Sequence, residues 1–139
     1  MKTALIFSLI LTCAVVSAAQ TKSKCFRSEW LQGERSVNLT IRGNKVTGTF
    51  TVESADESSP KVYGFHGTLR GSKLTVAFAA NKRPDISPSK ITGSIWRLVR
   101  HGDRELLRIK VFGKNYETNK YEDSFADFES CDTRAKSGR

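Results

Sequence analysis

Residues 35–53 read RSVNLTIRGNKVTGTFTVE, and this stretch decides how the chain is predicted to fold. On both sides of Gly43-Asn44, apolar and polar residues alternate with a period of two, which is typical of half-buried β-strands. Glycine and asparagine also tolerate the positive φ of a two-residue hairpin turn. The stretch therefore predicts a β-hairpin with one apolar face. That face would carry Val37, Leu39, Ile41, Val46, Gly48, Phe50 and Val52.

The same strand-turn-strand unit recurs downstream, and no helical periodicity follows residue 19. Two more hairpins are predicted, with strands over 62–70 and 73–80 around Gly71-Ser72, and over 90–100 and 104–112 around a three-residue turn at 101–103. Residues 54–60 and the proline-containing stretch 81–89 are predicted loops. Strands over 24–31 and 123–131 would open and close the domain.

Eight antiparallel strands joined by short links can close into a barrel, which leaves no unpaired sheet edge. We therefore predict an all-β fold, a small eight-stranded antiparallel up-and-down β-barrel of calycin-like type, as one domain over 20–132. An open β-sandwich is the alternative. Residues 133–139 form a basic tail outside this domain.

The N-terminus has the features of a secretory signal peptide. Lys2 precedes an apolar run over 4–16, and small residues follow at 17–19. This order predicts a signal peptide over 1–19, cleaved after Ala18 or Ala19, because the apolar run is too short to span a bilayer. A lipoprotein acylated at Cys13 is the alternative. The mature chain is expected to be secreted, without a membrane span.

Cleavage would remove Cys13 and leave two cysteines, which most simply form one disulfide in an oxidising compartment. In a closed eight-stranded barrel the first and last strands are antiparallel neighbours, so Cys25 and Cys131 would lie side by side. We predict that their disulfide pins the seam of the barrel.

The formal net charge of the whole chain is +9, and loss of Lys2 leaves about +8. A basic secreted protein favours polyanions or acidic matrix as partners, and solubility is the alternative role of the charge. The cations are spread along the chain, so no nucleic-acid motif is predicted. One basic end of the barrel is predicted to hold Arg42, Lys45, Arg70 and Lys73, with Lys82 and Arg83 reaching the same region.

A series of short motifs runs in order along 25–126. They are Cys25, Trp30, Asn38-Leu39-Thr40-Ile41, Thr47-Gly48-Thr49-Phe50, His66-Gly67-Thr68, Leu74-Thr75-Val76, Ile91-Thr92-Gly93 and the segment 102–107. Their order resembles that of the avidin and streptavidin family. The resemblance implies the same barrel, with outer faces buried in homo-oligomers.

The resemblance does not extend to the biotin site. The positions of the ligand-facing tryptophans fall on Phe78, Val111 and Tyr116, and the tyrosine that binds the ureido oxygen falls on Phe50. The remaining polar positions fall on Ser36 or Val37 and on Ser124. Each hydrogen bond missing from a buried polar head costs ~1–3 kcal/mol. Biotin is therefore not the expected ligand.

No part of the sequence predicts catalysis, a metal or a cofactor. His66 and His101 have no second ligand at metal-binding spacing, and no serine lies in a nucleophile elbow. Asn38 begins an Asn-x-Thr sequon on the outward face of its strand, so it is a candidate glycosylation site. We therefore predict that the protein is not an enzyme.

The third hairpin predicts a partner surface. A three-residue turn would set Leu98 opposite Leu106 and place an apolar stripe on the outside of the barrel, typical of a binding or self-association surface. That stripe consists of Trp96, Leu98, Leu106 and Phe112. The alternative is that the last strand, loops or tail cover it.

Three functions remain as hypotheses. The first is a secreted, non-catalytic binding or extracellular matrix-type protein that acts by surface contacts. The second is a carrier of a small apolar ligand inside the barrel, for which interior volume is the discriminating observation. Its predicted lining is Phe50, Phe65, Phe78 and Tyr116. The third is an inhibitor or effector that acts on another protein through the loop at 81–89.

Overall fold

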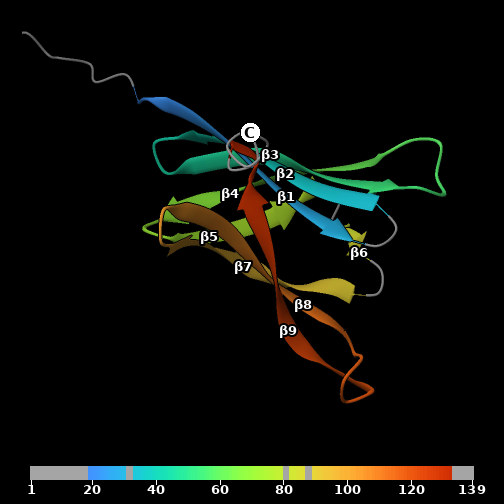
Figure 1. Ribbon diagram of the computed structural model, residues 1–139. Coiled ribbons are helices and arrows are strands. Elements are labelled where there is room, and N and C mark those ends of the chain that lie inside the picture. Colours follow the sequence, from blue (N-terminus) through green and yellow to red (C-terminus); the bar gives the residue numbers. More distant parts are fainter. Residues whose placement is uncertain (1–18, 31–32, 80–81, 87–88, 133–139) are drawn as a thin grey trace, which may run out of the picture.

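The computed structural model describes residues 19–30, 33–79, 82–86 and 89–132 (Figure 1). Residues 1–18 of the predicted signal peptide, including Cys13, and the basic tail lie outside the described residues. Nine β-strands and no α-helix make up the described part of the chain. The strands are β1 Thr21–Trp30, β2 Gly33–Arg42, β3 Lys45–Ser54, β4 Lys61–Arg70, β5 Lys73–Phe78, β6 Asp85–Ile86, β7 Ser89–His101, β8 Arg104–Asn115 and β9 Lys120–Ser130.

Eight of these strands form a closed antiparallel barrel, so the predicted barrel is confirmed. The alternative of an open β-sandwich is excluded. Each of β1 to β4 pairs with the strand that follows it, β7 pairs with β8, and β8 pairs with β9. The barrel closes through two further pairings, β1 with β9 and β5 with β7. The two-residue strand β6 only adds to the edge of β7.

Three two-residue turns connect β2 to β3, β4 to β5 and β7 to β8. Each begins with a glycine at positive φ, which is 62° at Gly43, 59° at Gly71 and 61° at Gly102. A glycine in the first central position is the pattern of the type II′ hairpin turn, whose twist matches that of the strands. The up-and-down topology places all three turns at the same end of the barrel, on the left of Figure 1.

Aromatic side chains fill the centre of the barrel. The Trp96 ring lies 5.2 Å from Phe65, 5.9 Å from Phe78 and 6.4 Å from Phe50, centroid to centroid. Phe128 of β9 packs against Phe50 at 5.7 Å. All five are buried, and each of the strands β1 to β5 and β7 to β9 contributes at least one side chain to the same core.

The position of Trp96 corrects the sequence prediction, which placed it on the outer face. Ile91 pairs with Val111 and Trp96 pairs with Ile109, so the four residues 92–95 lie opposite Lys110 alone. This bulge changes the phase of the strand. Trp96 therefore points inward and is 0% exposed, whereas Ile95 points outward and is 43% exposed.

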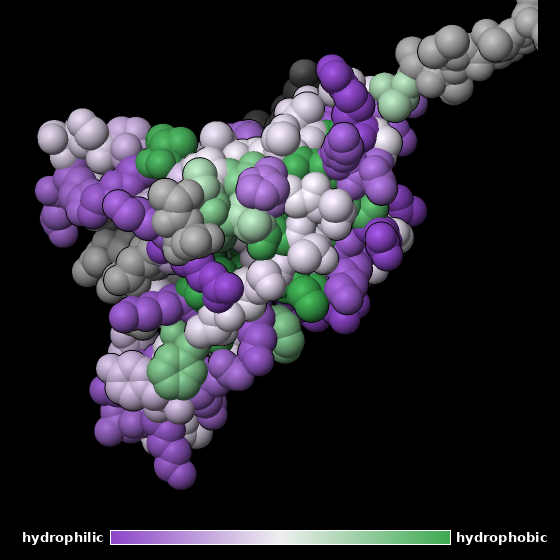
Figure 2. All heavy atoms as spheres, turned by 180° about the vertical axis from the view of Figure 1, so that it is seen from behind, coloured by the Kyte–Doolittle hydropathy of each residue, from purple (hydrophilic) through white to green (hydrophobic). Residues whose placement is uncertain are grey.

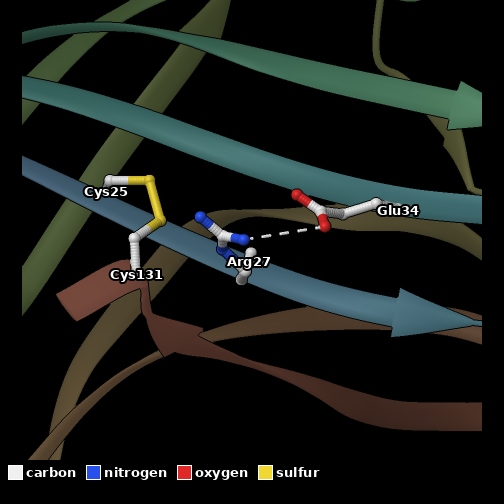
Figure 3. Close-up of a disulfide and its surroundings, with 4 residues drawn as sticks. All are labelled: Cys25, Arg27, Glu34 and Cys131. Atoms are coloured by element: carbon white, nitrogen blue, oxygen red, sulfur yellow. Dashed lines mark ion pairs between the residues drawn. A yellow bond between two sulfur atoms is a disulfide. The ribbon is translucent and has the colours of Figure 1, made fainter. Parts of the chain in front are cut away.

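The predicted disulfide is confirmed, and it lies at the seam of the barrel (Figure 3). The Cys25 and Cys131 Cα atoms are 5.4 Å apart. Beside them, β1 and β9 pair only at Phe26 with Ser130 and at Arg27 with Glu129. The rest of the β8–β9 hairpin leans away from β1 (Figure 1).

An ion pair also crosses the seam, beyond the C-terminal end of β9 at Ser130. Lys24 of β1 reaches past that end to β8, and its Nζ donates to Glu105 Oε1 at 2.6 Å. Both side chains are about one-third exposed, so this ion pair is partly shielded from water. The disulfide and this pair supplement the short β1–β9 ladder.

Candidate functional site at the basic mouth of the barrel

The end of the barrel formed by the start of β1 and the three glycine turns is rich in cations. We call this end the basic mouth. Its cations are Lys22, Lys24, Arg42, Lys45, Arg70, Lys73, Arg97, Arg100 and Arg104. The acidic residues near it are fewer: Asp103, Glu105, Glu129 and Asp132. Figure 2, which views the molecule from behind, shows hydrophilic side chains gathered along the right-hand edge, where these turns lie.

The outer rim of the basic mouth places like charges directly opposite one another. Arg42 pairs with Lys45 across the first turn. Lys73 pairs with Arg70 on one side and with Arg97 on the other. Like charges at directly opposite positions destabilise a sheet. Among the described residues, no carboxylate forms an ion pair with any of these five cations, all of which are exposed.

A depression of about 600 Å³ lies inside this rim. Its apolar lining comes from Ile41, Leu69, Leu98 and Val99, and its charged lining from Lys22, Lys24, Arg100 and Glu105. The cavity is therefore neither purely apolar nor purely polar. Four of the five rim cations were predicted from the sequence. The cavity was not, because inward-facing lysines do not fit the apolar pattern of an interior.

The predicted position of Lys82 and Arg83 is wrong, since they lie at the opposite end of the barrel. The strand β5 runs away from the basic mouth, and the segment that follows it stays at the far end. There the Arg83 guanidinium donates from Nη1 to the Thr92 carbonyl at 2.7 Å.

That opposite end carries acidic residues in a cross-strand row. Glu34 pairs with Glu29 on β1 and with Glu53 on β3. Arg27 Nη1 lies 3.9 Å from Glu34 Oε2. Figure 3 draws this ion pair. Arg35 on β2 is half-buried near this end, and loss of hydration lowers the pKa of its guanidinium. The two ends of the barrel therefore differ in charge.

The predicted ligand-lining set does not form one cavity. Phe50, Phe65 and Phe78 do lie together, but they pack against Trp96 and fill the interior themselves. Tyr116 lies in the β8–β9 turn, is 72% exposed and contacts Lys114 instead. The aromatic centre supports a barrel filled by its own side chains.

The predicted outer stripe is also incomplete. Trp96 is buried, Leu98 and Leu106 are partly buried, and only Phe112 is exposed. The regular two-residue turn at Gly102-Asp103 pairs Leu98 with Leu107, not with Leu106. The prediction of a three-residue turn was therefore wrong. The two-residue turn shifts the pairing of β7 with β8 by one residue, so different side chains face outward.

The structure places a different aromatic row outside, on the β8–β9 hairpin. Phe112 stacks on Tyr121 with 6.0 Å between centroids, and Phe125 lies beneath the Arg108 guanidinium. Arg108 also donates two hydrogen bonds of 2.7 Å to Asp127, and these lower the pKa of that carboxyl. The outward position of Phe112 was predicted, whereas those of Tyr121 and Phe125 were not. Phe125 and Phe128 are three residues apart, so regular alternation over 123–131 cannot place both on the inner face and does not decide which of them faces outward.

Asn38, the candidate glycosylation site, is exposed on β2, where it pairs with Cys25 and Thr49. Its modification stays a prediction. Within the described residues, no group of three or more histidine, cysteine, aspartate or glutamate side chains is arranged to hold a metal ion. The same residues include no helix of the length and hydropathy required for a membrane span.

No protein-family model, curated protein or solved structure matches this chain. The resemblance to the avidin and streptavidin family therefore stays a prediction.

Proposed function

We propose that this chain is a secreted, non-catalytic binding protein that holds polyanions, such as sulfated glycans or acidic matrix polymers, at its basic mouth. The observation that carries the proposal is the rim of like-charged pairs. Arg42 faces Lys45, and Lys73 faces both Arg70 and Arg97, without a carboxylate ion pair among the described residues. A dense anion relieves this repulsion.

The binding energy would come from the summed field of the rim and from release of counterions by the polyanion. No single cation should dominate, because exposed charges are screened over about 8 Å at physiological ionic strength. Neighbouring rim cations lie on paired strands, so one extended anion could contact several of them together.

The filled interior favours such surface contacts over the alternative of a carrier with a deep apolar cavity. Phe50, Phe65 and Phe78 close around Trp96 at the centre of the barrel. A ligand at that depth would have to displace these rings. Solid side-chain packing there leaves little room for a ligand at the centre of the barrel.

Retention on a heparin column tests the proposal. The wild-type protein is expected to elute above physiological ionic strength. The variant Arg42→Gln/Lys45→Gln/Arg70→Gln/Lys73→Gln should elute at much lower salt, with the log–log salt slope of its affinity reduced by about one per lost contact.

The matched control removes the same number of charges far from the basic mouth, as Lys82→Gln/Lys90→Gln/Lys114→Gln/Lys120→Gln. This control should elute close to the wild type. Equal shifts in the two variants would show that net charge alone is responsible. Elution of the wild type below physiological ionic strength would reduce the basic charge to a solubility role.

A further inference from the structure

The cavity inside the basic mouth differs from its rim because its charged residues lie on the inward phase of their strands. Side chains two residues apart share one face of a strand. Lys22 and Lys24 therefore share the inner face with the buried Phe26, and Arg100 shares it with Trp96 and Leu98. The cations point into the mouth of the barrel, not outward like Lys45 and Lys73.

Inside the cavity, positive charge exceeds negative charge. Glu105 is the carboxylate in its lining, and the ion pair with Lys24 already engages it at 2.6 Å. Within the described part of the chain, neither Lys22 nor Arg100 has an ion-pair partner. Two cations therefore face the cavity without compensation, which is complementary to an anionic group.

The floor of the cavity is apolar. Ile41 is buried, Leu69 and Leu98 are partly buried against the core, and all three line the cavity. The hydrated groups of a polyanion would leave this surface in contact with water. A ligand with an apolar body would remove it from water and gain hydrophobic stabilisation.

We infer that this cavity binds a small anionic amphiphile, a single carboxylate or sulfate on a short alkyl or aryl body. The body lies on the floor of Leu69 and Leu98, and the head contacts Lys22 and Arg100. The volume of about 600 Å³ lies within the roughly 300–1,000 Å³ of small-molecule sites. The inference rests on the proposed function because both require the basic mouth to attract anions.

Titration calorimetry with decanoate, below its micelle concentration, tests the inference on the mature protein. Saturable one-to-one binding of decanoate is expected. Decanol should bind at least about tenfold more weakly because it lacks the charge, and decyltrimethylammonium should not bind. Decanol binding as tightly as decanoate would overturn the assignment of an anionic head.

Variants then separate the cavity from the rim. Lys22→Ala and Arg100→Ala change exposed residues and should each weaken decanoate binding about tenfold, equivalent to ~1.4 kcal/mol. The outward-facing controls Lys45→Ala and Lys73→Ala should change it by less than about twofold. A stronger effect of the controls than of the cavity variants would overturn the inference.

Filling the cavity distinguishes this inference from the proposed function. Leu69→Trp should abolish decanoate binding while heparin retention is unchanged, with folding checked by circular dichroism. If decanoate fails to bind the wild type but heparin is retained, only the inference fails. If neither binds, the proposed function fails too. Should Leu69→Trp not fold, Lys22→Ala and Arg100→Ala decide the question alone.

Discussion

Removal of the Cys25–Cys131 disulfide is expected to lower the free energy of unfolding by ~2–5 kcal/mol. The two cysteines are 106 residues apart, so the bond restricts nearly the whole domain in the unfolded state. The chain-entropy model gives ~4–5 kcal/mol for a loop of this length. The seam otherwise has the Lys24–Glu105 ion pair and a short ladder, in which β1 and β9 pair at only two positions beside the disulfide.

Urea unfolding of the wild type and of Cys25→Ser/Cys131→Ser measures this effect. The transition of the double variant should move to lower urea, and reduction of the wild type should reproduce the shift. As a control, reductant should not move the transition of the double variant. Coincident transitions for the oxidised wild type and the variant would contradict the prediction.

Replacement of Trp96 by alanine should cost ~3–5 kcal/mol of unfolding free energy. The indole is fully buried and contacts three phenylalanine rings of β3, β4 and β5. Its removal leaves a void at the centre of the barrel. The surrounding strands are hydrogen-bonded to neighbours on both sides, so they cannot move inward freely to fill it. A cavity of this kind adds to the lost hydrophobic transfer energy.

Trp96→Phe should cost less than Trp96→Ala. Phenylalanine keeps a ring in the aromatic cluster, and it also removes the buried indole Nε1, which has no hydrogen-bond partner among the described residues. A buried donor without a partner is itself destabilising, by ~1–3 kcal/mol. The loss of packing volume and the loss of this donor therefore act in opposite directions.

The neighbouring Ile95 supplies the matched control for both variants. It lies on the outward side of the bulge, so Ile95→Ala should change the unfolding free energy by about 0.5 kcal/mol or less. Thermal and urea unfolding of the three variants give the comparison. If Ile95→Ala cost as much as Trp96→Ala, the phase that the bulge imposes on β7 would be wrong.

The sequence alone determined the features that depend on local pattern. Alternation around Gly43-Asn44 and Gly71-Ser72 predicted two hairpins with the observed register, because a two-residue glycine turn fixes which residues face each other. Counting strands predicted that the first and last would be neighbours, and with them the Cys25–Cys131 disulfide. The sequence also predicted that the four cations flanking those two turns lie at one end of the barrel, where the structure has them. They are Arg42, Lys45, Arg70 and Lys73.

Only the tertiary structure decided the phase of β7 and the filling of the barrel. Both faces of residues 95–99 carry apolar side chains, so periodicity cannot choose between Ile95 and Trp96 for the interior. The choice depends on which side chain fits among Phe50, Phe65 and Phe78, which come from distant strands. The bulge permits that fit because it places four residues, 92–95, opposite the single residue Lys110 of β8.

The inward position of Lys22 and Lys24 was likewise decided in three dimensions. Lysines in a strand normally indicate a solvent-facing side, and here β1 extends beyond the end of β9, so its inner face stays open to water at the mouth. A charged side chain can remain hydrated at that position, although it shares a face with the buried Phe26. Local alternation specifies which residues share a face, whereas the relative lengths of neighbouring strands decide whether that face is core or cavity.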